Sequence, residues 1–256
     1  MWHHICSLFI ESRKYMSMNY NELNFGGMTR ERELSMSAAF PILMRKVYVW
    51  MTLALVLTGV TAYGVASSPG IMTALFSNQL LFWGLVIAEF ALVIGISAAI
   101  NRLSLTTATL MFVLYSIING AVLSSIFLIY TMSSIASVFF ITAGTFAVMA
   151  LIGYTTKTDL TSMGKILFMA LIGIIIATIV NIFLKSSGLE MIVSYLGVLI
   201  FVGLTAYDSQ KIKNMLLMAP DAGEAAQKVA LLGALNLYLD FINLFIYLLR
   251  IFGRRE

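Results

Sequence analysis

Seven long apolar segments constrain the fold of this 256-residue chain more than any other feature. A helix of about 20 apolar residues is long enough to cross the ~30 Å hydrocarbon core of a bilayer. Only 11% of the residues are charged and 60% are hydrophobic, a balance that excludes a soluble globular domain. The sequence therefore predicts an all-α, polytopic membrane protein, a single bundle of seven transmembrane helices. The segments cover residues 47–66, 80–100, 106–129, 135–154, 163–184, 191–207 or somewhat beyond, and 229–252.

The first 46 residues differ from the rest of the chain. Acidic and basic residues alternate there without a hydrophobic period, which is typical of a solvated segment. The stretch also lacks the uninterrupted apolar core and cleavage site of a secretory signal peptide. We expect residues 1–46 to form a polar, mobile tail in the cytoplasm and residues 47–256 to form the membrane domain. The single cysteine, Cys6, excludes an internal disulfide bond.

The basic residues predict the orientation of the bundle, because cytoplasmic loops carry the excess of lysine and arginine. A cytoplasmic N-terminus leaves only Lys185, Arg250, Arg254 and Arg255 on the far side. Since the C-terminus is itself basic, a re-entrant last segment with both termini in the cytoplasm stays an alternative. The cytoplasmic side would hold Arg13, Lys14, Arg30, Arg32, Arg45, Lys46, Arg102, Lys157, Lys165, Lys211, Lys213 and Lys228.

The net charge of +4 is spread over several loops. This distribution indicates contact with anionic lipid and excludes a nucleic-acid partner. Pro41, Pro69 and Pro220 all fall outside the expected spans, so the helices should be continuous. Continuous helices favour a gated bundle over a transporter with broken helices.

Two aspartates, Asp208 and Asp240, lie in the last two apolar segments. A carboxylate near the centre of a membrane helix costs about 2.5 to 3.5 kcal/mol, so it is rarely kept without a proton, a cation or a polar cavity. The turn-forming residues 219–223 lie near the midpoint of the pair, so an antiparallel hairpin would bring both to similar depth. Two neighbouring carboxyls titrate as a coupled pair. The pair therefore predicts a site that responds to protons and cations.

Further polar residues could support this pair. Asn236 and Asn243 share a helix face with Asp240, which predicts a polar stripe toward the bundle interior. A third acid, Glu89, lies in the middle of the second segment. Since no basic residue lies well inside a segment, the carboxyls need protons, water, cations or a basic residue at a helix end such as Arg102. A purely structural role stays open for all three acids.

Three stretches of sequence carry a family resemblance: GYTTKTDL at residues 153–160, GLTAYDSQKIK at 203–213 and ALNLYLDFINLFIYLLR at 234–250. They resemble the Bax inhibitor-1 family, also called the transmembrane Bax inhibitor motif family, and most closely its bacterial inner-membrane members. The similarity extends over residues 41–255. It implies seven helices with the last one central, and a pH-sensitive calcium leak gated by a di-aspartyl site. The site residues would be Asp208 and Asp240, in transient contact with Ca²⁺.

The resemblance also implies an arginine on the second helix that latches one aspartate. The nearest candidate is Arg102, at the end of the second segment.

Other functions compete with a leak. A retinal pump needs a lysine in the last helix, and residues 229–252 contain none. An intramembrane aspartyl protease needs Gly-x-Gly-Asp where this chain has Leu237-Tyr-Leu-Asp240. Without a nucleophile paired to a base or a His/Cys metal spacing, we expect neither enzyme activity nor a cofactor. The main alternative is a non-transporting interaction protein that modulates a membrane protease or a stress response. A proton-coupled transporter is a third.

Overall fold

The computed structural model describes residues 30–254. Within them, seven helices are long and apolar enough to cross a membrane, which confirms the predicted all-α seven-helix bundle. A short helix, α3, and a 3-10 turn, η3, join the long ones. The elements are α2 (Arg30–Ala66), α3 (Pro69–Ser77), α4 (Gln79–Ala99), α5 (Leu105–Leu123), η3 (Ser124–Leu128), α6 (Met132–Thr155), α7 (Thr161–Leu184), α8 (Ser187–Leu217) and α9 (Glu224–Phe252).

The first helix begins well before the predicted boundary at residue 46. Its apolar span starts at Ala38, and Leu43 and Val47 are completely buried. The reason is a stripe of apolar residues four apart, Ala39, Leu43 and Val47, that continues the core face of the helix toward its start. Residues 38–46 therefore belong to the bundle rather than to a tail. The expectation of a mobile segment over residues 1–29 lies outside the described residues.

Two of the three prolines lie where the sequence predicts. Pro69 is the first residue of α3, where its missing N–H costs nothing, and Pro220 lies in the turn between α8 and α9. Pro41 is different, because it lies inside α2 and not before the first span. One backbone hydrogen bond is therefore missing near the start of that helix.

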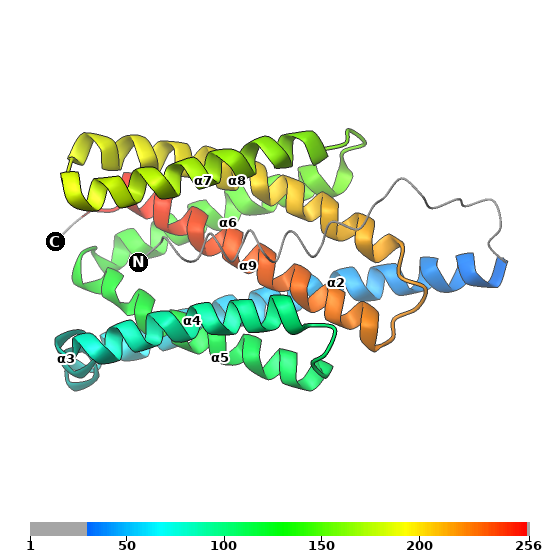
Figure 1. Cartoon of the computed structure of the whole chain (residues 1–256), viewed down its shortest axis with the longest axis horizontal. Coiled ribbons are helices and arrows are strands. Elements are labelled where there is room, and N and C mark those ends of the chain that lie inside the picture. Colours follow the sequence, from blue (N-terminus) through cyan, green and yellow to red (C-terminus); the bar gives the residue numbers. More distant parts are fainter. Residues whose placement is uncertain (1–29, 255–256) are drawn as a thin grey trace.

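The last helix lies at the centre of the bundle (Figure 1). Every residue from Gly233 to Leu249 is buried, as expected of a helix enclosed on all sides. The helices α2, α6 and α8 pack directly against it, while α7 packs on α8 and exposes half of its residues. This arrangement agrees with the central last helix that the family resemblance implies.

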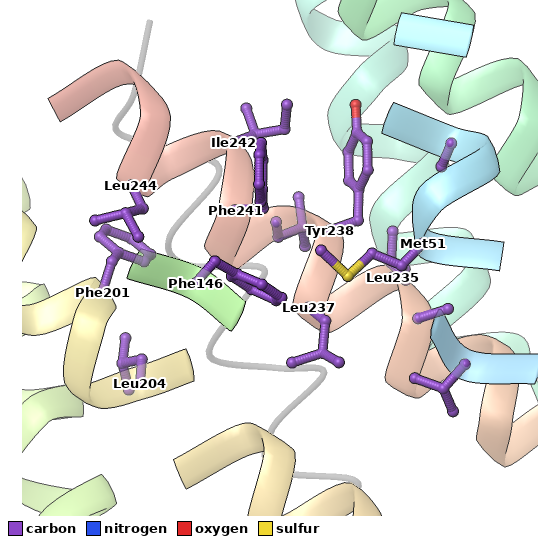
Figure 2. Packing of buried hydrophobic residues seen from close by; sticks show 14 of the residues in the cluster. Met51, Phe146, Phe201, Leu204, Leu235, Leu237, Tyr238, Phe241, Ile242 and Leu244 are labelled. Carbon is purple, nitrogen blue, oxygen red and sulfur yellow. The ribbon is translucent and has the colours of Figure 1, made fainter. Parts of the chain in front are cut away.

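Aromatic side chains from neighbouring helices hold α9 in place (Figure 2). Phe146 of α6 lies edge-on to Phe241, with ring centroids 5.5 Å apart. Phe201 of α8 stacks on Tyr247, with centroids 5.9 Å apart. Edge-to-face and offset-stacked rings are the favourable geometries for such pairs. The position of α9 is therefore fixed from two sides by large buried rings.

Hydrogen bonds tie the loops together at each end of the bundle. At one end Lys46 Nζ donates to Gln227 Oε1 at 2.7 Å, and Leu105 N donates to Glu224 Oε1 at 3.1 Å. At the other end Arg254 N donates to Ser134 Oγ at 2.9 Å, beside the start of α6. The last helix thus runs without a break from one end of the bundle to the other (Figure 1), which favours a complete seventh span over the re-entrant alternative.

Candidate functional site

Asp208 on α8 and Asp240 on α9 are both completely buried. They lie on two helices that run antiparallel and pack along their length (Figure 1). Each aspartate belongs to the buried face of its own helix. The last two helices therefore keep both carboxyls inside the bundle and away from lipid.

The relative depth of the two aspartates follows from glycine contacts between the same helices. Gly197 lies against the ring of Tyr247, and Gly233 lies against Ile212. The residue numbers of these two contacts average 222 and 222.5. In two antiparallel helices, residues whose numbers have the same average lie at the same depth, so Asp240 lies level with Thr205. Asp208 is three residues beyond that level, about 4.5 Å along the helix axis. The two acids lie within about one turn of each other in depth, close to the depth that the hairpin argument predicts.

The polar stripe on α9 is buried, but its two asparagines are used differently. Asn243 Nδ2 donates to Leu239 O of its own helix at 2.7 Å. Asn236 is 1% exposed, and its Oδ1 has no hydrogen-bond partner among the described residues. Since Asn236 precedes Asp240 by four residues, the two side chains are neighbours on one helix face. The stripe therefore places an unused amide oxygen one turn from Asp240.

Arg102 and Glu89 lie apart from the aspartate pair. Arg102 is exposed in the turn between α4 and α5. Glu89 is buried on α4, where it accepts a hydrogen bond from the Asn119 side chain of α5. The structure thus brings together the last two helices' acids and Asn236, and places the other two candidates elsewhere.

A buried lysine, Lys211, lies close to Asp208 along α8, beyond the span predicted at residues 191–207. Lys211 is 8% exposed, because α8 continues to Leu217 and carries its core face past the predicted end of the span. Three residues separate Lys211 from Asp208, so both lie on the same helix face. The Lys211 ammonium lies 5.7 Å from the centroid of the Tyr207 ring, within the range of a cation–π contact. The sequence signal for this extension was the pair of apolar residues Ile212 and Leu216, which continue the core face of α8 beyond residue 207.

The segment of α8 around Asp208 is fixed to α6 and to the loop that follows α6. Gln210 Oε1 accepts from Leu160 N, and Gln210 Nε2 donates to Thr158 O, both at 2.8 Å. Ser209 Oγ donates to Ala150 O at 2.8 Å. These contacts hold Asp208 on a rigid element, which favours a defined position for its carboxyl.

The described residues contain few side chains that could together ligate a metal ion. No group of three or more His, Cys, Asp or Glu residues that could hold a metal ion occurs within residues 30–254. Resident Ca²⁺ takes about six to eight oxygen ligands. Two carboxyls and one amide oxygen fall short of that set, so a calcium ion at this place would keep several of its waters.

Seven apolar helices, one of them buried at the centre of the bundle, define this chain as an integral membrane protein. Two buried acids lie on the last two helices. Residues 41–256 match the family described as "Inhibitor of apoptosis-promoting Bax1". The chain therefore belongs to the Bax inhibitor-1 family, as its sequence motifs predict. This family is not known for enzymes.

Bacterial relatives match over most of their length. The chain is 54% identical over 215 residues to "Inner membrane protein YbhL" of Escherichia coli K12, covering 83% of this chain and 92% of that protein. A protein of Borreliella burgdorferi is 50% identical over 213 residues, 83% of this chain and 92% of its own. A protein of Rickettsia prowazekii is 45% identical over 215 residues, 83% and 89% of the two chains.

Proposed function

We propose that this chain is a multi-pass protein of the bacterial inner membrane that lets cations, calcium among them, leak across under the control of protons bound at Asp208 and Asp240. The observation that carries the proposal is the enclosure of both carboxyls, each 0% exposed, between two packed helices at nearly one depth. The inner-membrane location is supported by the 54% identity to YbhL.

The chemistry of such a pair supports proton control. Two carboxyls in a site of low dielectric do not ionise independently, because the first negative charge opposes the second. A proton or a cation can satisfy the pair, so the two compete for the same oxygens. The amide oxygen of Asn236 adds a neutral ligand one turn away. A partly hydrated cation would therefore bind weakly here, as a leak requires.

Calcium flux into proteoliposomes, measured between about pH 5 and 8, tests the proposal. We expect protein-dependent flux that changes with pH in the wild type and loses that dependence in Asp208→Asn and Asp240→Asn. A single proton equilibrium changes a population up to about tenfold per pH unit, so the loss is measurable. Asp221→Asn is the matched control, because it removes the same charge from an exposed turn. A wild-type pH response in both buried variants would contradict the proposal.

A second candidate function is a non-transporting protein that binds a membrane protease or another protein of a stress response. The observation that favours it is the outer face of α7, which exposes large apolar side chains that lipid or a partner helix could cover. Folded protein without flux above that of empty liposomes would favour this function. The exposed residues include Ile166, Met169, Ile176, Val180, Ile182 and Phe183.

A further inference from the structure

A chain of polar side chains crosses four helices on the far side of α9 from Asp240. The Tyr238 hydroxyl lies 3.0 Å from Asn119 Oδ1 and 2.7 Å from Thr58 Oγ1. Thr58 Oγ1 also lies 3.0 Å from the carbonyl oxygen of Ser116. At the other end Asn119 hydrogen-bonds Glu89. The five residues belong to α2, α4, α5 and α9, and none is more than 5% exposed.

Tyr238 places this row of polar side chains on the opposite face of α9 from the aspartate pair. Residues 238 and 240 are about 200° apart around a helix, so their side chains leave α9 in opposite directions. Figure 2 shows the Tyr238 ring pointing away from Phe201 of α8, with its hydroxyl at the far end. Phe112 of α5 fixes the ring edge-on, with centroids 5.8 Å apart. Gly120 lets α5 approach α2 here, because an added Cβ would lie 2.5 Å from Thr58 O.

The hydrogen bonds between Glu89 and Ser116 O can donate in either of two directions along the row of side chains. The two directions differ in how many of the four contacts hold a hydrogen. In the orientation of the structure, Asn119 donates to Glu89, and Tyr238 donates to Asn119. Thr58 then has one hydrogen for two acceptors, the oxygens of Ser116 and Tyr238. One of the four contacts is therefore left without a hydrogen.

The reverse direction fills every contact, and it needs a proton on Glu89. A half-turn of the Asn119 amide would present its oxygen to Glu89 and its NH₂ to Tyr238. Glu89 would then donate to Asn119, Asn119 to Tyr238, Tyr238 to Thr58, and Thr58 to Ser116 O. Each contact has its own hydrogen only when the carboxyl of Glu89 is protonated.

The surroundings of Glu89 also favour the neutral acid. Its Oε1 is buried and has no hydrogen-bond partner among the described residues. The titratable groups that face it are Tyr115 from α5 and Tyr238 from α9, which are neutral phenols near pH 7 and supply no positive charge. The short helix α3, which also packs on α4, contains no titratable side chain. A buried carboxylate without a counter-charge is costly, and a proton removes that cost.

We infer that Glu89 is a second proton-binding site, separate from the aspartate pair, whose proton sets the direction of the hydrogen-bonded chain from α4 through α5 and α9 to α2. Protonation lets Tyr238 donate to Thr58 while Thr58 keeps its bond to Ser116 O, so that α2 is hydrogen-bonded to α9 and to α5 at the same time. The inference does not depend on ion flux, so it stands or fails independently of the proposed leak.

Infrared difference spectroscopy of the full chain in lipid nanodiscs, titrated with acid and base, tests the inference. We expect a protonated-carboxyl C=O band that titrates in the wild type and in the Asp208→Asn, Asp240→Asn double variant but is lost in Glu89→Gln. Glutamine has nearly the same volume as the neutral acid, and it can both donate to and accept from Asn119, so the variant should fold. A spectrum of Glu89→Gln that equals the wild-type spectrum would overturn the inference.

Thr58→Val tests the direction of the chain. Valine leaves the Tyr238 hydrogen without an acceptor in the protonated direction only, so the midpoint of the Glu89 band should move about one pH unit lower. The matched control is Thr142→Val, because Thr142 is completely buried and its hydroxyl donates only within α6, to Val138 O at 2.8 Å. We expect no shift in the control. Equal midpoints in the two valine variants would overturn the proposed direction.

Discussion

At the scale of single residues, the three buried acids within residues 30–254 divide into two groups around α9. Asp208 and Asp240 lie toward α8, whereas Glu89 reaches α9 from the other side through Asn119 and Tyr238. Among the described residues, Lys211 lies one turn from Asp208 on the same helix face, whereas the groups that face Glu89 supply no positive charge. The two groups should therefore respond differently to the loss of a charge.

Lys211→Met tests the influence of that lysine. A nearby ammonium stabilises negative charge, so in the proposed leak its removal should let protons act on the flux at higher pH. We expect the midpoint of the pH-dependent calcium flux to move to higher pH by about one unit or less. Lys165→Met, at an exposed position near the start of α7, is the control and should leave the midpoint in place. A midpoint that stays in place, as in the control, would show that Lys211 does not act on the pair.

At the scale of helices, Gly153 allows α6 to lie close against α8, because it has no side chain. An added Cβ at Gly153 would overlap the carbonyl group of Ala206, two residues before Asp208. The same approach lets Ser209 and Gln210 reach the end of α6 and its loop. The packing that positions Asp208 therefore depends on Gly153.

Gly153→Ala should force the two helices apart and destabilise the protein by about 1 to 3 kcal/mol, the usual cost of overpacking. Gly144→Ala in the same helix is the matched control, because no atom lies within 4 Å of the added Cβ. That control should be neutral or slightly stabilising, since alanine favours a helix. Thermal unfolding in detergent measures both. Equal melting temperatures for the two variants would argue against the close contact.

At the scale of the whole molecule, the two ends of the bundle differ in charge. The end that holds the start of α2 also holds Arg45, Lys46, Arg102, Lys157, Lys165, Lys211, Lys213 and Lys228, while the other end holds Lys185, Arg250 and Arg254 (Figure 1). Because cytoplasmic flanks carry the excess of basic residues, we propose that the first end faces the cytoplasm.

Cysteine labelling tests this orientation. In a Cys6→Ser background, a membrane-impermeant maleimide should label Ser187→Cys in intact spheroplasts, because that position is exposed at the far end of the bundle. Asp221→Cys, in the turn at the other end, should be labelled only after permeabilisation. We expect strong labelling of the first position and little labelling of the second before permeabilisation, as the distribution of basic residues predicts. The opposite pattern would invert the proposed topology.

The sequence by itself determined the seven helices and the burial of the two aspartates. A bilayer requires apolar segments of fixed length, so each span can be predicted from its own residues alone. The short turn after α8 likewise sets the depth of Asp208 against Asp240 within about one helical turn. The motifs at residues 153–160, 203–213 and 234–250 predicted the family, and the family match confirms it.

Only the tertiary structure decided which polar groups meet. It extended α2 to residues assigned to the tail, buried Lys211 beside Asp208, and left Arg102 exposed. It also joined Glu89 to a chain in which Thr58 and Tyr238 are 180 residues apart and Asn119 and Tyr238 are 119 apart. Such contacts depend on how whole helices pack against one another. A local pattern of hydropathy states which face of a helix is buried but not which helix covers that face.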